Sequence, residues 1–299
     1  MRIQLCQPMT PMRWFLTAIA LAACIAANSD AQTRFEVDHA GMAGAPALIL
    51  IPGLATPGEV WTDTVAELGN SADIYTITAA GFGDVPAVGE GAFLDPLVAE
   101  LADYLDSQNL DDVTIVGHSM GGQIALQLAA LRPQHVGRVL VVDSAPFFLR
   151  LFNPAATPEQ AAQYGQMMAA QLAAMPREQF LAMSQQGLAI QSMTPEGQAR
   201  VMGWIERADQ DAVARAMVEV AGTDFTPTLA DVRAKVTVLA AWSEGAPMTA
   251  EQLLAVYQGQ YASLPDVQVH IIADSRHFIM LDQPEAFMRE LTAVLPAGE

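Results

Sequence analysis

The sequence predicts an α/β protein with a doubly wound, mostly parallel sheet and an inserted helical cap. Short apolar runs rich in β-branched residues are bounded by Gly, Pro and Asp, as in strands of a parallel sheet that is covered on both faces. Helix-length segments separate most of these runs, and the βαβα order favours a doubly wound sheet. One long interval without an apolar run predicts the inserted cap.

The expected strands are the six runs of near-continuous apolar residues in the chain. They occupy residues 47–51, 74–78, 113–116, 139–142, 236–240 and 267–272. Four segments with the apolar spacing of a helix alternate with them, at residues 97–107, 123–131, 249–261 and 284–294. These elements predict one core domain formed by residues 32–143 and 231–299.

The interval 144–230 is expected to form the cap. It contains three or four helical segments rich in Met, Gln and Ala, and prolines such as Pro158, Pro176 and Pro195 mark their starts. Seven methionines lie in it: Met167, Met168, Met175, Met183, Met193, Met202 and Met217. Methionine suits either an adaptable helical core or a lid over an apolar pocket. We favour a lid, because the insertion follows a strand end, where such sheets bind ligands.

The first 31 residues have the order of an export signal. Arg2 and Arg13 precede an apolar segment at 14–23 that is short for a membrane span, and small and polar residues follow it. Cleavage after Ala31 is one expectation, and lipidation at Cys24 after a lipoprotein signal that ends at residue 23 is the alternative. We therefore expect an exported protein, periplasmic or secreted or lipid-anchored, whose mature chain has no transmembrane span.

Charge and composition exclude several classes of partner. The net charge of −19 disfavours binding to nucleic acid or to anionic lipid. A glycine-rich dinucleotide motif and a His, Cys and acid cluster at metal-ligand spacing are both missing from the sequence. We expect no cofactor and no metal.

The motif with the clearest chemistry is Gly-His-Ser-Met-Gly-Gly at residues 117–122. It follows an expected strand and precedes an expected helix, which is the setting of a nucleophile elbow. Small residues at 117 and 121 allow a sharp turn that presents Ser119 above the sheet. Ser119 is the candidate nucleophile.

With this motif, the chain resembles the α/β-hydrolase superfamily from about Ala47 to Val294. The resemblance implies a base after the last strand, where His277 lies within Asp-Ser-Arg-His-Phe. It also implies an oxyanion hole from the backbone amides of Leu54 and Met120, with the turn Ile-Pro-Gly-Leu at 51–54 in place of the family's His-Gly-x turn. His118, beside the nucleophile, is interpreted as a packing or hydrogen-bonding neighbour and not as the base.

The acid departs from the usual pattern. Much of the family carries an aspartate after the strand at 236–240, but Glu244 is the only carboxylate there. Some members carry the acid one strand earlier, where Asp143 ends the strand at 139–142. Because the later position has no aspartate, we favour Asp143 over Glu244. The acid is defined by its geometric role, which is to orient the histidine, and not by its position in the sequence.

The expected function is acyl transfer from carboxylic esters to Ser119, followed by hydrolysis. The substrate is expected to be a small ester-like molecule with an apolar group. Lactonase, thioesterase, amidase and carbon–carbon bond hydrolase activities use the same residues and stay open. A non-catalytic small-molecule-binding protein of the same fold is the alternative from another class.

Overall fold

The computed structural model describes residues 33–296. From residue 33 on, the chain forms one compact unit. The expected export signal, its cleavage site after Ala31 and the lipidation site Cys24 lie outside the described residues. Among the helices of residues 33–296, none is long and apolar enough to cross a membrane.

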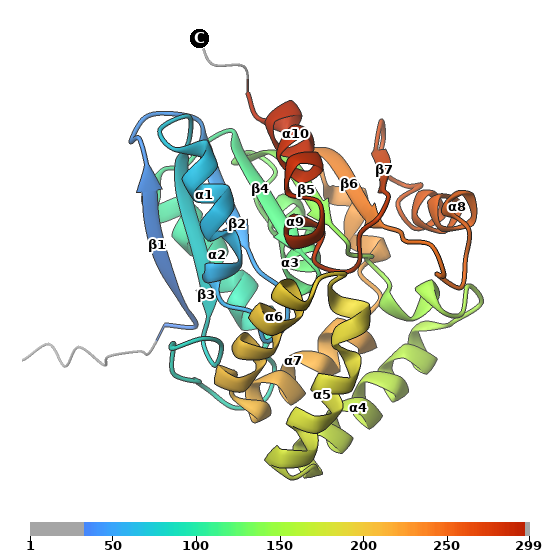
Figure 1. The fold of residues 1–299 in the computed structure, drawn as a ribbon. Helices are drawn as coiled ribbons and strands as arrows, with labels where there is room; N and C mark the ends of the chain where they lie inside the picture. Colours follow the sequence, from blue (N-terminus) through green and yellow to red (C-terminus); the bar gives the residue numbers. More distant parts are fainter. Residues whose placement is uncertain (1–32, 297–299) are drawn as a thin grey trace, which may run out of the picture. The chain divides into compact units, whose positions relative to one another are not determined.

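The centre of the molecule is a seven-stranded sheet in the order β1-β3-β2-β4-β5-β6-β7 (Figure 1). All neighbouring strands are parallel except β1, which pairs antiparallel with β3. The strands are β1 Phe35–Gly41, β2 Ala47–Ile51, β3 Asp73–Ala79, β4 Val113–His118, β5 Val136–Val142, β6 Lys235–Ala241 and β7 Gln268–Ile272. The mostly parallel α/β sheet predicted from the sequence is confirmed, with β1 as an additional edge strand.

The helices of the core follow the predicted alternation. They are α1 Thr62–Leu68, α2 Leu94–Gln108, α3 Met120–Leu131, α8 Ala250–Gln260, α9 Ile279–Asp282 and α10 Pro284–Val294. Among the described residues there are three short 3₁₀ segments: η1 Gly58–Trp61 before α1, and η2 Phe148–Leu151 and η3 Thr226–Asp231 at the two ends of the stretch between β5 and β6. The helix α3 begins three residues earlier than its apolar spacing suggests, directly after Ser119.

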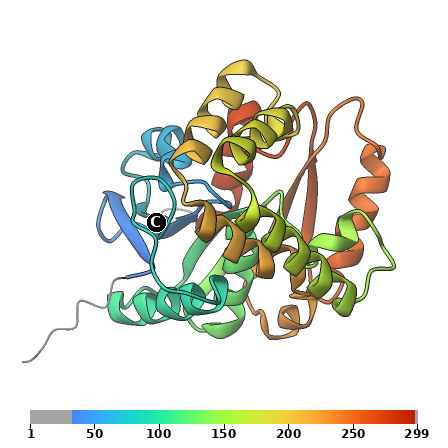
Figure 2. The ribbon, with the colours of Figure 1, turned by 90° about the horizontal axis from the view of Figure 1, so that it is seen from below.

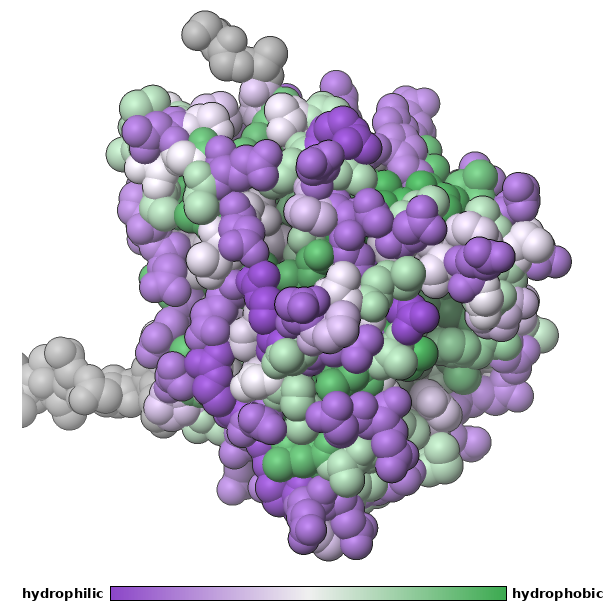
Figure 3. Space-filling view, viewed as in Figure 1, coloured by the Kyte–Doolittle hydropathy of each residue, from purple (hydrophilic) through white to green (hydrophobic). Residues whose placement is uncertain are grey.

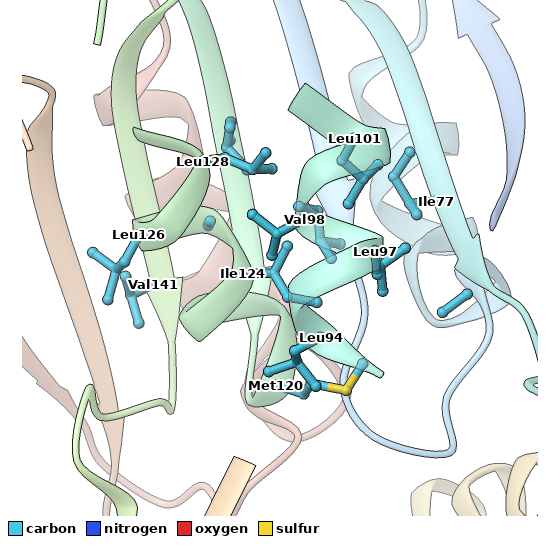
Figure 4. Packing of buried hydrophobic residues seen from close by; sticks show 14 of the residues in the cluster. Ile77, Leu94, Leu97, Val98, Leu101, Met120, Ile124, Leu126, Leu128 and Val141 are labelled. Carbon is cyan, nitrogen blue, oxygen red and sulfur yellow. The ribbon is translucent and has the colours of Figure 1, made fainter. Parts of the chain in front are cut away.

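Alternate residues of the inner strands face opposite layers of helices, so both faces of the central part of the sheet are buried. Ile49 and Ile51 contact the cluster formed with α2, α3 and α8, whereas Leu48 and Leu50 contact the cluster formed with η1, α1 and α10. Figure 4 shows the first cluster, with side chains of α2 and α3 packed against each other and against the sheet: Leu94, Leu97, Val98, Leu101, Ile124, Leu128, Ile77 and Val141. The strands β4 and β5 are buried up to their last residues.

Four helices are inserted between β5 and β6 and lie at one end of the sheet (Figures 1 and 2). They are α4 Pro158–Ala174, α5 Arg177–Gln191, α6 Pro195–Arg207 and α7 Gln210–Gly222. Pro158 and Pro195 are first helical residues, and Pro176 is the N-cap of α5. The fourth helix starts after Asp209, whose side chain accepts a hydrogen bond from the Ala212 amide. We call α4–α7 the cap helices.

The methionines of the interval 144–230 lie in two kinds of surroundings. Met167, Met183 and Met193 are exposed, whereas Met202 and Met217 pack against the core. On the face seen in Figure 3, hydrophobic residues form small patches among hydrophilic ones. The methionines are thus divided between solvent and core.

Polar contacts fasten the cap helices to the core. Arg207 at the end of α6 pairs with Glu59 of η1 at 2.6 Å, and this hydrogen bond lowers the pKa of Glu59. Glu219 of α7 accepts hydrogen bonds from the amides of Leu94 (2.8 Å) and Asp95 (3.2 Å) at the start of α2. A carboxylate is stabilised at a helix N-terminus by the free amides and the helix dipole.

Candidate active site

Ser119 lies in a strained turn between β4 and α3. Its backbone has φ +54° and ψ −119°, a conformation that L-residues rarely adopt, and its side chain is half-buried. The turn brings backbone atoms so close that a Cβ at Gly117 would overlap the Gly121 carbonyl, and one at Gly121 would overlap the Ile51 carbonyl. Strain of this kind is typical of functional sites.

His277 lies in the loop between β7 and α9, and it reaches Asp143 at the end of β5. The distance from His277 Nδ1 to Asp143 Oδ2 is 2.7 Å. Asp143 also has a positive φ, +45°, which turns its side chain out of the line of the strand. Because the Ser119 amide donates to the carbonyl of Val142 (3.0 Å), the residue before Asp143, all three side chains belong to one end of the sheet.

The second oxygen of the Asp143 carboxylate is also occupied. Oδ1 accepts hydrogen bonds from the Ala241 amide (2.9 Å) and from the Tyr257 hydroxyl (3.2 Å). Burial, with the nearby Asp143 charge, raises the pKa of Tyr257 well above its ordinary value, so the phenol keeps the proton that it donates. The sequence did not predict Tyr257, because a contact across 114 residues leaves no local pattern.

Glu244, the other candidate acid, occupies an exposed turn after β6. Within residues 33–296, no hydrogen bond or ion pair joins its carboxylate to His277. Of the two carboxylates, the structure brings Asp143 to the histidine.

His118 is fully buried beneath His277. Its Nε2 is 2.9 Å from the His277 carbonyl oxygen, and the two rings lie 4.5 Å apart. Burial, aided by the neighbouring His277, lowers the pKa of His118 well below its ordinary value. A neutral ring facing a carbonyl oxygen carries its proton on Nε2, because the carbonyl can only accept. His118 therefore holds the backbone of His277, in agreement with the predicted neighbour role.

The two amides expected to form the oxyanion hole flank Ser119. Leu54 follows β2, and Met120 is the first residue of α3. Within the described part of the chain, neither amide donates a hydrogen bond to another protein group. The first amides of a helix are free in this way. A Cβ at Gly53 would lie 3.1 Å from that of Ser119, so the glycine lets this turn approach the serine.

The Ser119 hydroxyl and His277 are not joined by a hydrogen bond in the structure of residues 33–296. This bond is often long in a free enzyme and tightens around substrate.

A cavity of about 580 Å³ lies elsewhere, between the loop after β3 and the helices α4 and α7. Its walls are mainly small residues with a few charged ones: Ala87, Gly89, Glu90, Gly91, Ala169, Ala170, Ala173, Asp209, Asp211, Ala214, Arg215 and Val218. It includes none of Ser119, His277 or Asp143. Among residues 33–296, no group of three or more His, Cys, Asp or Glu side chains could hold a metal ion.

Comparison with known proteins decides the family. The sequence pattern of the Alpha/beta hydrolase family matches residues 48–290. The chain belongs to this family. It is therefore a hydrolase with the α/β-hydrolase fold, as the sequence predicted.

Individual relatives of this α/β hydrolase carry several names. A protein of Serratia proteamaculans named "Putative carbamate hydrolase RutD" is 27% identical over 83% of this chain and 90% of its own. A pimeloyl-[acyl-carrier protein] methyl ester esterase of Aromatoleum aromaticum is 25% identical over 80% of this chain and 94% of its own. Other matches are shorter, and the chain spans 41% of a RutD protein of Yersinia enterocolitica.

Solved structures of the same fold include the enol-lactonase from Burkholderia xenovorans. It superimposes with a TM-score of 0.71 at 17% sequence identity, over 87% of this chain and 95% of the lactonase. At this identity the likeness establishes the shared fold.

Proposed function

We propose that this hydrolase cleaves carboxylic esters through an acyl-enzyme on Ser119. The observation that carries the proposal is the 2.7 Å contact between His277 Nδ1 and Asp143, at the same end of the sheet as the strained Ser119 turn. Asp143 orients the imidazole and stabilises the imidazolium that forms during the reaction.

The reaction takes place in two halves. His277 Nε2 accepts the Ser119 proton while Oγ attacks the ester carbonyl, and the amides of Leu54 and Met120 donate to the developing oxyanion. Collapse of the tetrahedral species expels the alcohol, which takes the proton from His277. Water then gives one proton to the same histidine and attacks the acyl-enzyme. As the acid leaves, His277 returns this proton to Ser119 Oγ, which restores the free serine.

The substrate class is supported by the relatives. One is named a methyl ester esterase and another structure is an enol-lactonase, and a lactone is a cyclic ester. Another relative is named "Putative carbamate hydrolase RutD", and a carbamate has a carbonyl that a serine can attack as it attacks an ester. We propose small esters with an apolar acyl or alkyl group as substrates, with lactones and thioesters as the closest alternatives.

The test is covalent labelling combined with turnover. Purified protein is incubated with a fluorophosphonate, the modified residue is located by mass spectrometry, and hydrolysis of p-nitrophenyl esters of increasing chain length is measured beside lactones and thioesters. Stoichiometric labelling of Ser119 with turnover that Ser119→Ala removes is the expected result. Ligand binding without labelling or turnover would instead identify a non-catalytic binding protein.

We also propose that the chain is exported, from the charge and apolar order of residues 1–31. Intact-mass measurement of the mature protein separates the two processing routes. A start at Gln32 indicates simple cleavage, and a diacylated start at Cys24 indicates a lipoprotein. An unprocessed Met1 in a soluble cell fraction contradicts export.

A further inference from the structure

The backbone on either side of His277 is held by three separate hydrogen bonds. The Arg276 amide donates to Asp282 Oδ2 at 2.8 Å, and the His277 carbonyl accepts from His118 at 2.9 Å. The Phe278 amide donates to the carbonyl of Gln191 at 2.9 Å, and Gln191 is the last residue of the cap helix α5. One of these three supports therefore comes from the cap.

Asp282 joins the same cap segment through its other oxygen. Oδ1 accepts hydrogen bonds from the Ser192 hydroxyl (2.6 Å) and the Met193 amide (2.9 Å), in the turn between α5 and α6. Ser192 is completely buried. One carboxylate thus spans two segments, the cap turn 191–194 and the histidine loop 275–282, that lie about 90 residues apart in the chain.

Packing adds to this junction. The ring of Phe278, next to His277, lies 5.9 Å from Trp204 of the cap helix α6 and 4.6 Å from His118. Phe278 is buried in the cluster that also holds Trp204 and Leu188. A shift of the cap turn would therefore disturb both the polar and the apolar contacts of the histidine loop.

We infer that Asp282 is a positioning residue that couples the seating of the cap to the orientation of His277, an inference that rests on the proposed role of His277 as base. Its two oxygens bind donors of opposite segments, so neither segment can move without loss of a charge-assisted hydrogen bond. Such bonds are the strong ones in proteins, and a misplacement of about 1 Å at a reacting group can lower a rate by about 10²-fold.

Asp282→Asn is the central variant. An amide has one acceptor oxygen, and its NH₂ group must face either the Arg276 amide or the Ser192 and Met193 donors, so one side of the link is lost. We expect kcat for ester hydrolysis to fall by about 10- to 100-fold. Glu285→Gln is the matched control, because Glu285 is an exposed carboxylate three residues away. Its kinetics should equal those of the wild type.

Ser192→Ala removes one of the two cap-side hydrogen bonds to Asp282 and leaves those from the Met193 and Arg276 amides. Here we expect KM to rise several-fold with a smaller loss of kcat, because the cap turn is loosened while Asp282 still holds the histidine loop. In the double variant the loss in kcat/KM should be smaller than the product of the two single losses, because Ser192 acts through Asp282. Fully multiplicative losses would overturn the coupling.

Hydrogen exchange followed by mass spectrometry tests the link without any substrate. Asp282→Asn should speed exchange in peptides covering both 190–195 and 274–281, and Glu285→Gln should speed neither. Faster exchange in one segment alone contradicts coupling. If the wild type hydrolyses no ester but both segments respond, the proposed function fails and the coupling stands. If Asp282→Asn does not fold, Ser192→Ala serves as the test: faster hydrogen exchange in residues 274–281 supports the coupling, and unchanged exchange there contradicts it.

Discussion

The carboxylate of Asp143 is held from three directions at the end of β5. It meets His277, the Ala241 amide and the Tyr257 hydroxyl, and the Asp143 amide donates to the Leu239 carbonyl at 2.7 Å. These contacts leave the carboxylate a single orientation. Glu244, in contrast, faces solvent.

The first prediction follows from this difference. Asp143→Asn should lower kcat for ester hydrolysis by up to about 10⁴-fold, because an amide cannot hold the productive tautomer of His277 or stabilise its cation. Glu244→Gln should stay within about twofold of the wild type, since removing a solvent-facing charge leaves the site intact. Steady-state kinetics of the two purified variants measures both. Full activity in Asp143→Asn would mean that another group orients the base.

His118 leads to a prediction for stability against pH. Burial holds the pKa of His118 well below the ordinary value of about 6.5. On acidification, His118 therefore binds a proton in the unfolded chain while it stays neutral in the folded chain. His118 therefore makes its full contribution to the free energy of unfolding above about pH 6.5. As the pH falls below this value, the contribution declines by at most about 1.4 kcal/mol per pH unit.

Thermal unfolding between pH 8 and pH 5 checks this sign. At pH 8, His118→Gln should be less stable than the wild type. As the pH falls, the stability of the variant should decrease less than that of the wild type. The difference in Tm between the two proteins must therefore shrink from pH 8 to pH 5. A constant or growing difference would show that His118 accepts a proton in the folded state.

At the scale of elements, the contact between α4 and α7 depends on two glycines. A Cβ at Gly165 would lie 2.5 Å from the Val218 carbonyl oxygen and 2.7 Å from Gly222 Cα, so the helices touch backbone to backbone. Gly187 in α5 is different, because a Cβ there meets no atom within 4 Å.

The same substitution should therefore have opposite effects at the two positions. Gly165→Ala forces the helices apart and should lower the free energy of unfolding by about 1–3 kcal/mol. Gly187→Ala should raise it by about 0.5–1 kcal/mol, because alanine costs less entropy in a helix. Chemical denaturation of both variants measures the two signs. Stabilisation by Gly165→Ala would refute the close packing.

The elements themselves were predictable where their sequence pattern is strong. Continuous apolar runs identified six strands, because a strand buried on both faces excludes polar residues. The edge strand β1 was missed, since its sequence Phe-Glu-Val-Asp-His-Ala-Gly is largely exposed and lacks such a run. The seven-residue α1 is too short for a clear helical period.

The site was predictable only where one local pattern carries it. Ser119 is the predicted nucleophile because the elbow requires small residues at fixed spacing, and His277 is the predicted base because the family resemblance implies a histidine after the last strand. The selection between Asp143 and Glu244 depends on where the ends of β5 and β6 lie in space. Tyr257 and Asp282 act through contacts between distant segments, and such contacts leave no motif in a single sequence.

At the scale of the whole molecule, the dominant feature is its charge. The chain carries 33 acidic and 14 basic residues, a net charge of −19. Several arginines pair with acids, as Arg138 does with Asp112 at 3.0 Å and Arg200 with Asp63 at 2.8 Å, but the excess of carboxylates has no partner of opposite charge. Repulsion among like charges destabilises a compact state.

Dilute salt should therefore stabilise this protein. Raising NaCl from about 10 mM to about 150 mM shortens the Debye length from about 30 Å to about 8 Å, which screens long-range repulsion more than it weakens pairs in direct contact. We expect Tm at pH 7.5 to rise over this range and then to level off. Exclusion of salt from the surface would instead add stability steadily up to molar concentrations. A fall in Tm between 10 and 150 mM would mean that the surface ion pairs contribute more than the net charge costs, and that the acidic surface is balanced locally in the folded state.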